Sequence, residues 1–346
     1  LDLCAGEVTL LAGGPPCQPF SKASLWATGD TARMLDPRAA TLRAYFRVLD
    51  AALPAVMLLE NVQGITYVAP EKRRSEEPVD VLRAELAAIN RRHGTCYEPQ
   101  VLAIDASDYG VPQRRRRVFI FAARDGTELA LPEPTHSDQD ETRHRLTTSW
   151  DAIGDLDDQD LDPSLAARGR WAALLPSIPE GENYQWHTPR GGGEPLFGWR
   201  TKYWSFLLKL AKSKPSWTLQ ALAGPATGPF HWRSRRLSVR EMARLQTIPD
   251  SHEIKGAQQA ARRQLGNAVP AAIGELLGLE IRRQLLGSRV RRSLRLIPTP
   301  RGDCPGPQPV EPVPAHYLVL KRDHEPHPGI GLGPGATQRN VDTQAA

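Results

Sequence analysis

A ten-residue stretch, AGGPPCQPFS at residues 12–21, constrains the fold of this 346-residue chain more than any other feature. It follows an apolar run, Val8 to Leu11, of the kind that forms a buried strand. The two glycines allow positive φ angles and close approach of the backbone, and the two prolines stiffen the chain. The sequence therefore predicts a thiol, Cys17, on a rigid loop at the carboxyl end of a strand, where open α/β sheets bind ligands.

Four further motifs follow this stretch in order along the chain. An isolated cysteine is more often a small core residue than a site group, so the motifs around and after Cys17 carry the argument. Each one follows an apolar run, follows a turn, or opens a helix. They are Glu60-Asn61-Val62, Gln113-Arg114-Arg115-Arg116-Arg117, the segment from Arg236 to Asp250, and the segment from Gln264 to Pro270.

Taken together, the five motifs resemble those of the DNA (cytosine-5) methyltransferases of bacterial type, in the family's order, from residue 8 to about residue 286. The resemblance implies an α/β fold with a Rossmann-like sheet that uses S-adenosyl-L-methionine as cofactor. It also implies an inserted, irregular target-recognition region. In the family, a Gly-rich turn that holds the cofactor lies upstream of the cysteine loop, and this turn is missing here. We interpret the chain as N-terminally truncated; the alternative is an internal deletion that joined two motifs.

The resemblance also implies roles for individual residues. Cys17 would add to carbon-6 of a flipped cytosine, and Glu60 would protonate ring nitrogen 3. Arg117, together with Arg115, would stabilise charge on the carbonyl oxygen of the base. On position alone, Glu60 would serve equally well as a helix cap. The other site residues that the resemblance implies are Pro16, Asn61 and Gln113 in the pocket for the base, and Asn267 and Ala268 near the cofactor.

Four consecutive arginines usually form a solvated basic patch. On a strand, however, alternate residues share a face. Arg115 and Arg117 are therefore predicted to point one way, and Arg114 and Arg116 the other.

Apolar spacing predicts the main elements of secondary structure. Ser238 and Glu241 have the spacing of a capping box at the start of a helix. The predicted helices are Thr41–Leu53, Val79–Ile89, Leu237–Gln246 and Gln264–Arg283, and the predicted strands are Val8–Leu11, Val56–Leu59, Val101–Ile104 and Val118–Phe121.

Composition divides the chain into four parts. Residues 1–131 read as an incomplete catalytic domain, 132–235 as the target-recognition region, and 236–286 as the return to the catalytic domain. Residues 287–346 are rich in Arg, Pro and Gly and are expected to be a disordered tail.

The target-recognition region holds seven of the eight tryptophans and an acidic stretch, Asp151 to Asp162, that is expected at the surface. Basic residues among the tryptophans suit nucleic-acid contact, although most of these tryptophans are expected to staple an irregular subdomain. The expected base contacts are Arg190, Arg200 and Lys202.

The net charge of +5 suits a polyanionic partner, and the resemblance identifies that partner as double-stranded DNA. The four cysteines are scattered and form no CxxC pair, which indicates a reducing cytosol and no metal site. No apolar run reaches the roughly 18 residues of a membrane span. We expect a monomer in a restriction–modification system, with a cognate restriction endonuclease acting separately. The alternatives are an inactive remnant that at most binds DNA, and a tRNA cytosine-5 methyltransferase.

Overall fold

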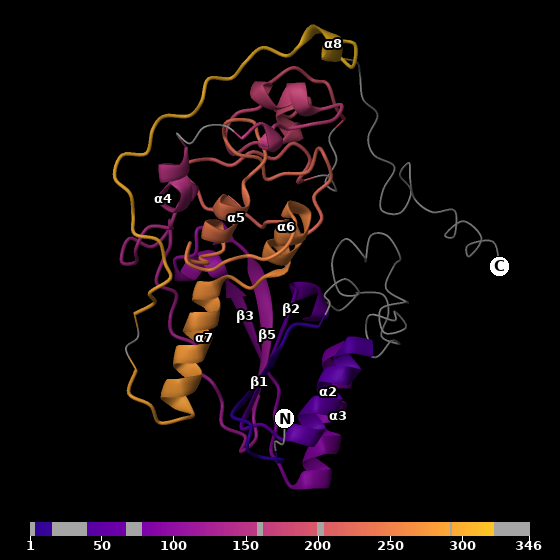
Figure 1. Ribbon diagram of the computed structural model, residues 1–346, viewed down its shortest axis with the longest axis vertical. Coiled ribbons are helices and arrows are strands. Elements are labelled where there is room, and N and C mark those ends of the chain that lie inside the picture. Colours follow the sequence, from indigo (N-terminus) through magenta and orange to yellow (C-terminus); the bar gives the residue numbers. More distant parts are fainter. Residues whose placement is uncertain are drawn as a thin grey trace, which may run out of the picture.

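The computed structural model describes residues 4–15, 40–66, 78–157, 162–198, 204–290 and 293–321. In the view of Figure 1, a sheet flanked by helices forms the lower part, and short helices and loops form the upper part. No helix in these described ranges is both long enough and apolar enough to cross a membrane.

The central sheet has four strands in the order β1, β2, β5, β3. β1 and β2 are parallel, and β5 is antiparallel to both of its neighbours, β2 and β3. β2 therefore ends at the edge of the sheet where β5 begins. The strands are β1 Leu10–Gly13, β2 Val56–Asn61, β3 Gln100–Asp105 and β5 Arg116–Ala123.

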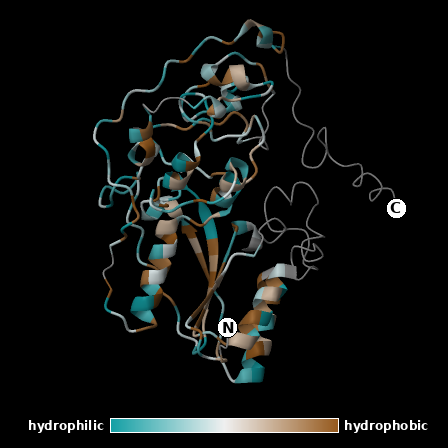
Figure 2. Cartoon of the chain, viewed as in Figure 1, coloured by the Kyte–Doolittle hydropathy of each residue, from teal (hydrophilic) through white to brown (hydrophobic). Residues whose placement is uncertain are grey.

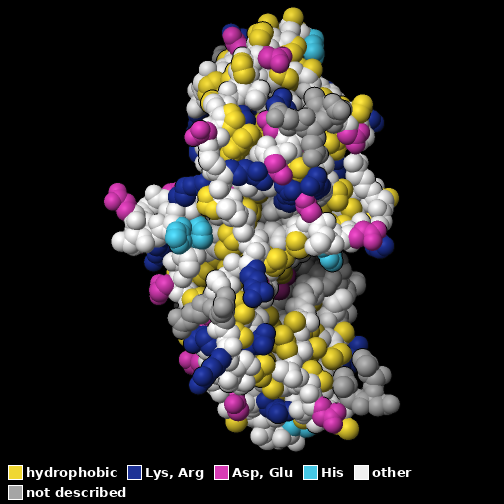
Figure 3. Space-filling model, turned by 60° about the vertical axis from the view of Figure 1, so that its left-hand side comes forward, with side chains coloured by type: hydrophobic (Ala, Val, Ile, Leu, Met, Phe, Trp, Pro, Cys, Tyr) yellow, Lys and Arg dark blue, Asp and Glu magenta, His cyan; other side chains and the backbone are white. Residues whose placement is uncertain are grey.

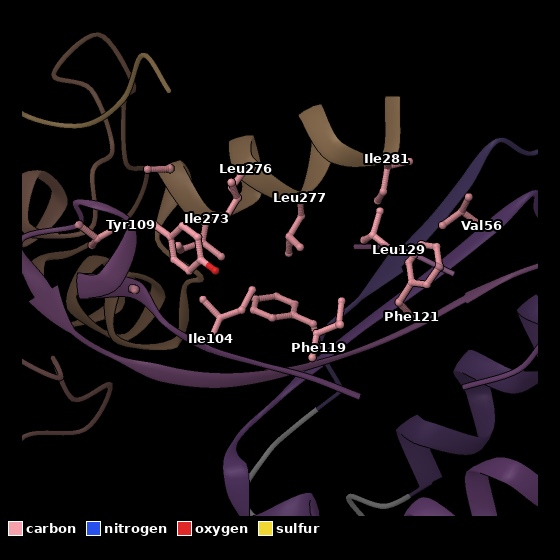
Figure 4. Packing of buried hydrophobic residues seen from close by; sticks show 14 of the residues in the cluster. Val56, Ile104, Tyr109, Phe119, Phe121, Leu129, Ile273, Leu276, Leu277 and Ile281 are labelled. Carbon is pink, nitrogen blue, oxygen red and sulfur yellow. The ribbon is translucent and has the colours of Figure 1, made fainter. Parts of the chain in front are cut away.

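Helices cover both faces of this sheet. α2 (Ala40–Ala52) and α3 (Pro78–His93) pack on one face, and α7 (Ala271–Gln284) packs on the other. Figure 4 shows Leu277 of α7 directed toward Phe119 on β5, and Ile281 directed toward Leu129 and Phe121. Because both faces of the central strands β2 and β5 are covered, these strands are hydrophobic along most of their length (Figure 2), whereas the edge strands β1 and β3 have partly exposed residues. This burial explains why β5 reads as a continuous apolar run.

The upper part is built from short elements. Its helices are α4 Ser149–Ile153, α5 Val239–Leu245, α6 Gln258–Asn267 and α8 Ala315–Leu318. A small parallel pair joins β4 (Gln113–Arg114) to β6 (Ser216–Trp217). The 3₁₀ helices are Gln63–Thr66 and Ala106–Tyr109 beside the sheet, and Gly154–Leu156, Pro163–Leu165, Ala172–Ser177 and Tyr184–His187 in the upper part.

The predicted division at residue 235 does not follow the packing. Leu245 of α5 and Leu265 of α6 share one apolar cluster with Leu219 and Trp232 of the inserted region. α5 and α6 therefore belong to the upper part, and α7 is the helix that returns to the sheet.

The predicted helix over Gln264–Arg283 is two helices in the structure. α6 ends at Asn267, Ala268 and Pro270 have extended ψ angles of 147° and 132°, and α7 starts at Ala271. A proline disfavours helical geometry in the residue before it, which explains the break. The capping box of α5 is confirmed, because Ser238 and Glu241 bond each other's backbone N–H groups.

Residues 293–321, which we call the C-terminal strap, differ from the expected disordered tail. In Figure 1 the strap climbs along one side of the molecule from the foot of α7 to α8 at the top. Leu296 and Ile297 pack against the core under α7, whereas Tyr317 is buried in the upper part. Composition misled the prediction, because a few apolar anchors suffice when the rest of the molecule supplies the core.

The expected surface acid stretch is corrected in part: Asp155 and Asp162 are exposed as expected, residues 158–161 lie outside the described ranges, and two other acids are buried. Asp151 is 2% exposed and forms part of the capping box of α4, and Asp157 is 8% exposed. Asp151 binds Arg145 at 2.7 Å, and Asp157 binds Arg233 at 2.6 Å. These carboxylates are buried because each has a guanidinium partner, which the run of acids alone does not reveal.

Candidate functional site

A partly buried carboxylate lies at the carboxyl end of β2. Glu60 is the second-last residue of this strand, and Arg117 lies near the start of β5 next to it. The Nε atom of Arg117 is 2.9 Å from Oε1 of Glu60, with side-chain exposures of 15% and 18%. Burial raises the pKa of the Glu60 carboxyl above its ordinary value, and the charges of Arg117 and Arg115 oppose this rise.

The glycine-proline loop passes directly over this carboxylate. A Cβ atom at Gly14 would lie 3.3 Å from Oε2 of Glu60. Asn61 is fully buried, and its Nδ2 donates to the carbonyl of Pro15 at 3.4 Å. Its Oδ1 accepts from the N–H of Val62 at 2.9 Å. Asn61 thus ties the start of the cysteine loop to the end of β2.

The glycines of the loop are needed for space and not for a special backbone angle. Neither Gly13 nor Gly14 has a positive φ, so that part of the prediction is wrong. A Cβ at Gly13 would lie only 2.8 Å from the ring of Tyr45. The hydroxyl of Tyr45 donates to the carbonyls of Leu11 and Leu58, which joins β1 to β2.

Arg115 lies between β4 and β5 and is 1% exposed. Its guanidinium donates to the carbonyl of Leu219 at 3.3 Å and to that of Gly266 at 2.8 Å. Arg115 therefore links the sheet edge to the upper part, while its charge acts on Glu60. Arg114 and Arg116 are exposed, as the alternation predicts.

Gln113 also makes its contacts with backbone groups. Its side chain is fully buried, donates to the carbonyl of Leu245 at 3.1 Å and accepts from the N–H of Leu219 at 3.2 Å. These bonds join β4 to α5 and to the chain after β6. Gln113 and Arg115 therefore share Leu219 as a hydrogen-bond partner, and both link β4 and β5 to the upper part.

The residues expected near the cofactor lie at the break between α6 and α7. The Asn267 side chain is exposed, and Ala268 is half-buried. The N–H of Ala268 bonds back to Gln264 and Leu265, so the chain turns sharply here. An exposed amide beside an extended backbone can bind a polar ligand, so these residues fit one side of a cofactor site.

Several predicted residues lie outside the described ranges. They are Cys17, Pro16, Arg200 and Lys202. Arg190 is exposed in the turn after the 3₁₀ helix Tyr184–His187, far along the chain from Glu60. Within the described ranges, no group of three His, Cys, Asp or Glu side chains could hold a metal ion.

Sequence reasoning missed two residues that support the site. Tyr45 fills the space left by Gly13, and Asp105 accepts from the N–H of Arg115 at 3.2 Å and from Arg116 at 3.0 Å. Tyr45 looked like one more apolar position of a helix. The only signal was its hydroxyl, which needs a hydrogen-bond partner when buried.

The tryptophans of the inserted region mostly staple it, as expected. Trp232 is fully buried, and Trp171 contacts Phe197, Phe206 and Tyr317. Trp204 is 45% exposed, and its ring meets that of Trp217 edge-on at 5.1 Å.

Comparison with known proteins gives consistent matches. The profile of a family described as C-5 cytosine-specific DNA methylase matches residues 2–283. The type II methyltransferase M.SacI of Streptomyces achromogenes is 39% identical over 81% of this chain and 73% of that protein. M.MthTI of Methanothermobacter thermautotrophicus is 30% identical over 81% of this chain and 80% of its own length. The solved structure of the S. pombe Dnmt2 methyltransferase aligns with a TM-score of 0.48 at 17% identity, covering 80% of this chain and 78% of that one.

Proposed function

Because the chain belongs to the C-5 cytosine-specific DNA methylase family, we propose that it methylates carbon-5 of a flipped cytosine in a specific double-stranded DNA sequence. The proposed reaction passes through a covalent adduct with Cys17. The observation that carries this proposal is the Glu60 carboxyl, which burial holds at a raised pKa beneath the cysteine loop.

Chain geometry supports Cys17 as the partner of Glu60. Asn61 holds Pro15, and Gly14 lies over the carboxylate. Cys17 follows Pro15 by two residues in the sequence, so the proposed nucleophile is covalently close to the point that Asn61 holds.

The proposed chemistry uses these groups as follows. The thiolate of Cys17 forms a bond to carbon-6 while Glu60 gives a proton to nitrogen 3, and carbon-5 becomes nucleophilic. A carboxyl with a raised pKa is protonated more often at neutral pH, which favours this donation. Arg117 stabilises negative charge on the oxygen of carbon-2. Once carbon-5 carries the methyl group, a base takes the carbon-5 proton, the bond between carbon-6 and sulfur breaks to release the thiolate, and nitrogen 3 returns its proton to Glu60, which restores the ring.

S-adenosylmethionine, the cofactor of this family, supplies an electrophilic methyl group when bound. Asn267 and Ala268 would form one side of its site, next to the start of α7. The reacting base must leave the stack to reach Glu60, because ring atoms inside a duplex are inaccessible.

The surface suits a DNA partner. One face gathers Lys and Arg side chains in a band halfway up the molecule (Figure 3). Basic bands of this kind attract the phosphate backbone. We further propose that Arg190, Arg200 and Lys202 contact bases, and that the protein acts as a monomer beside a separate restriction endonuclease.

Transfer of labelled methyl groups from S-adenosylmethionine to DNA tests the function. Incorporation into duplex DNA but not into tRNA is expected, and bisulfite sequencing of the product would give the target site. Cys17→Ser should abolish transfer, because a hydroxyl is far less nucleophilic than a thiolate. Retained transfer in this variant would refute the covalent adduct.

Glu60→Gln tests the proton donor. The amide keeps the shape of the side chain but cannot give up a proton in the same way, so transfer should slow by about 10²–10⁴-fold. DNA binding should change little by comparison. An equal loss of both would mean that Glu60 has only a structural role.

A further inference from the structure

A cavity of about 500 Å³ lies in the upper part, between the loop of residues 219–229 and the start of α6. We call it the α6 cavity. Two arginines line it, Arg236 from the chain before α5 and Arg262 from α6 itself. The positive charge of Arg262 lowers the pKa of Arg236, after the larger effect of burial, so the two guanidinium groups lie within electrostatic reach of each other.

Neither arginine has a carboxylate partner among the residues that the structure describes. Arg236 donates to the carbonyls of Thr227 at 3.0 Å and Gly224 at 2.6 Å. Arg262 donates to the carbonyl of Leu237 at 3.0 Å, and its buried Nε has no acceptor. Placing two like charges together and half-buried is unfavourable, so an anion bound between them would relieve the repulsion.

The same cavity contains the start of a helix. Gln258 and Gln259, the first residues of α6, line it, and no side chain caps this helix end. The first N–H groups of a helix have no acceptor within the helix and carry its positive dipole end. Two guanidinium groups and free backbone N–H groups together form the kind of site that binds phosphate.

A chain of contacts connects the cavity to Glu60. Leu219 lines the cavity, and its carbonyl accepts from Arg115, whose charge also acts on Glu60. Gly266, the other acceptor of Arg115, lies eight residues after Gln258 on α6. At about 1.5 Å per residue, the start of α6 at Gln258 therefore lies about 12 Å from Gly266 along the helix axis.

On the basis of the proposed function, we propose that the α6 cavity binds a backbone phosphate of the DNA, a few nucleotides from the flipped cytosine. Arg236 and Arg262 hold its oxygens together with the first N–H groups of α6. A duplex carries a phosphate about every 3.4 Å along each strand, so a strand whose cytosine reaches Glu60 also presents neighbouring phosphates to the surface around it. The contact positions the DNA and reads no base.

Arg262→Gln tests the proposal, and Arg263→Gln is its matched control. Arg263 is the next residue of the same helix, is exposed and does not line the α6 cavity. The two variants lose the same charge from the same helix. The probe is a 30-base-pair duplex that contains the sequence methylated in the transfer assay, or a mixed sequence if none is methylated. Fluorescence anisotropy gives the dissociation constant at several salt concentrations.

The expected result is about tenfold weaker binding for Arg262→Gln, because a charge-assisted bond to phosphate is lost. The slope of log K against log salt should fall by about 0.9, which is one released counterion. Arg263→Gln should change both quantities much less. Thermal stability of Arg262→Gln should be unchanged or higher, since a repulsion is removed.

Equal affinities and equal salt slopes for the two variants would overturn the proposal. So would a loss of thermal stability in Arg262→Gln without a change of slope, because Arg262 would then be structural. If Arg262→Gln lost only the binding of inorganic phosphate, measured by calorimetry, the site would be for a free anion and not for DNA. If the wild-type protein binds the duplex but transfers no methyl group, the proposed function fails while this test still stands.

Discussion

Two opposed effects act on the pKa of the Glu60 carboxyl. Burial raises its pKa, whereas Arg117 at 2.9 Å and the nearby Arg115 lower it. These opposed effects together set the ionisation of the carboxyl at the end of β2. A fully exposed glutamate would remain ionised at neutral pH and could not donate a proton.

Arg117→Gln should shift this balance in one direction. Without the guanidinium, only burial and the weaker effect of Arg115 remain, so the pKa of Glu60 should rise further. Carbon-13 NMR of the glutamate carboxyls, titrated in the wild-type and variant proteins, measures the change.

Arg116→Gln is the control for this titration, because Arg116 is exposed and pairs with Asp105. It should leave the Glu60 titration nearly unchanged. An unaltered or lower pKa of Glu60 in Arg117→Gln would contradict the ion pair as a determinant of its ionisation.

At the scale of elements, α4 depends on a buried carboxylate. Asp151 bonds the backbone of Thr148 at the start of α4, the side chain of Arg145, and the backbone N–H of Arg301 in the C-terminal strap. Burial raises the pKa of Asp151, but the hydrogen bonds from Arg145 and Thr148 outweigh it and lower the pKa to about 2.

This depressed pKa predicts how stability depends on pH. The folded-state pKa lies below the unfolded value of 3.8, so the stabilisation is complete above that value and is lost as pH falls toward 2. Asp151→Asn should lower the melting temperature at pH 6, and its difference from the wild type should shrink between pH 4 and pH 2.

Asp303→Asn serves as the comparison for this series, because Asp303 lies in the same strap and is exposed. Its melting temperature should follow that of the wild type at each pH. A constant difference between Asp151→Asn and the wild type down to pH 2 would show that the carboxylate charge of Asp151 does not stabilise α4.

The sequence predicts elements well where local chemistry decides them. The capping box at Ser238 and the apolar run of β5 are local signals, and both elements form where expected. The hydrogen-bond partners of the Arg115 side chain were not predictable from local sequence. Its acceptors are the backbone carbonyls of Leu219 and Gly266, 104 and 151 residues further along the chain. Every residue has a backbone carbonyl, so the sequence does not show which ones will accept a hydrogen bond.

The same distinction applies to the candidate site. Cys17 and Glu60 could be proposed because they lie within motifs, and the expected place of Glu60 at the end of a strand agrees with β2. The pairing of Asp151 with Arg145 and Arg301 was missed because buried charges depend on partners that only the tertiary fold supplies.

For the whole molecule, the C-terminal strap connects the two parts. Arg301 bonds Asp151 and Asp155 of the upper part. Tyr317 is buried in an apolar cluster of the upper part that also contains Leu174 and Tyr184. The ring of Tyr317 stacks on Trp171 at 5.7 Å, and its hydroxyl donates to the carbonyl of Arg170 at 2.6 Å.

Tyr317→Ala should destabilise the upper part by about 2–4 kcal/mol, because it removes a buried ring and leaves a cavity. Hydrogen exchange should rise most in residues 162–198, which form much of the cluster around this ring. Tyr317→Phe keeps the ring and should lose only about 1 kcal/mol. Equal effects of the two substitutions would mean that the hydroxyl, and not the packing, holds the strap.

The path of this strap sets a condition on exchanging the inserted region between relatives. A chimera that replaces only residues 132–235 would keep the native strap. Tyr317 and Arg301 of the strap would then lose the contacts that they make with the replaced residues. The unit that can be transplanted is therefore discontinuous in the gene. The unit to exchange comprises the inserted region, α5, α6 and the strap at residues 293–321.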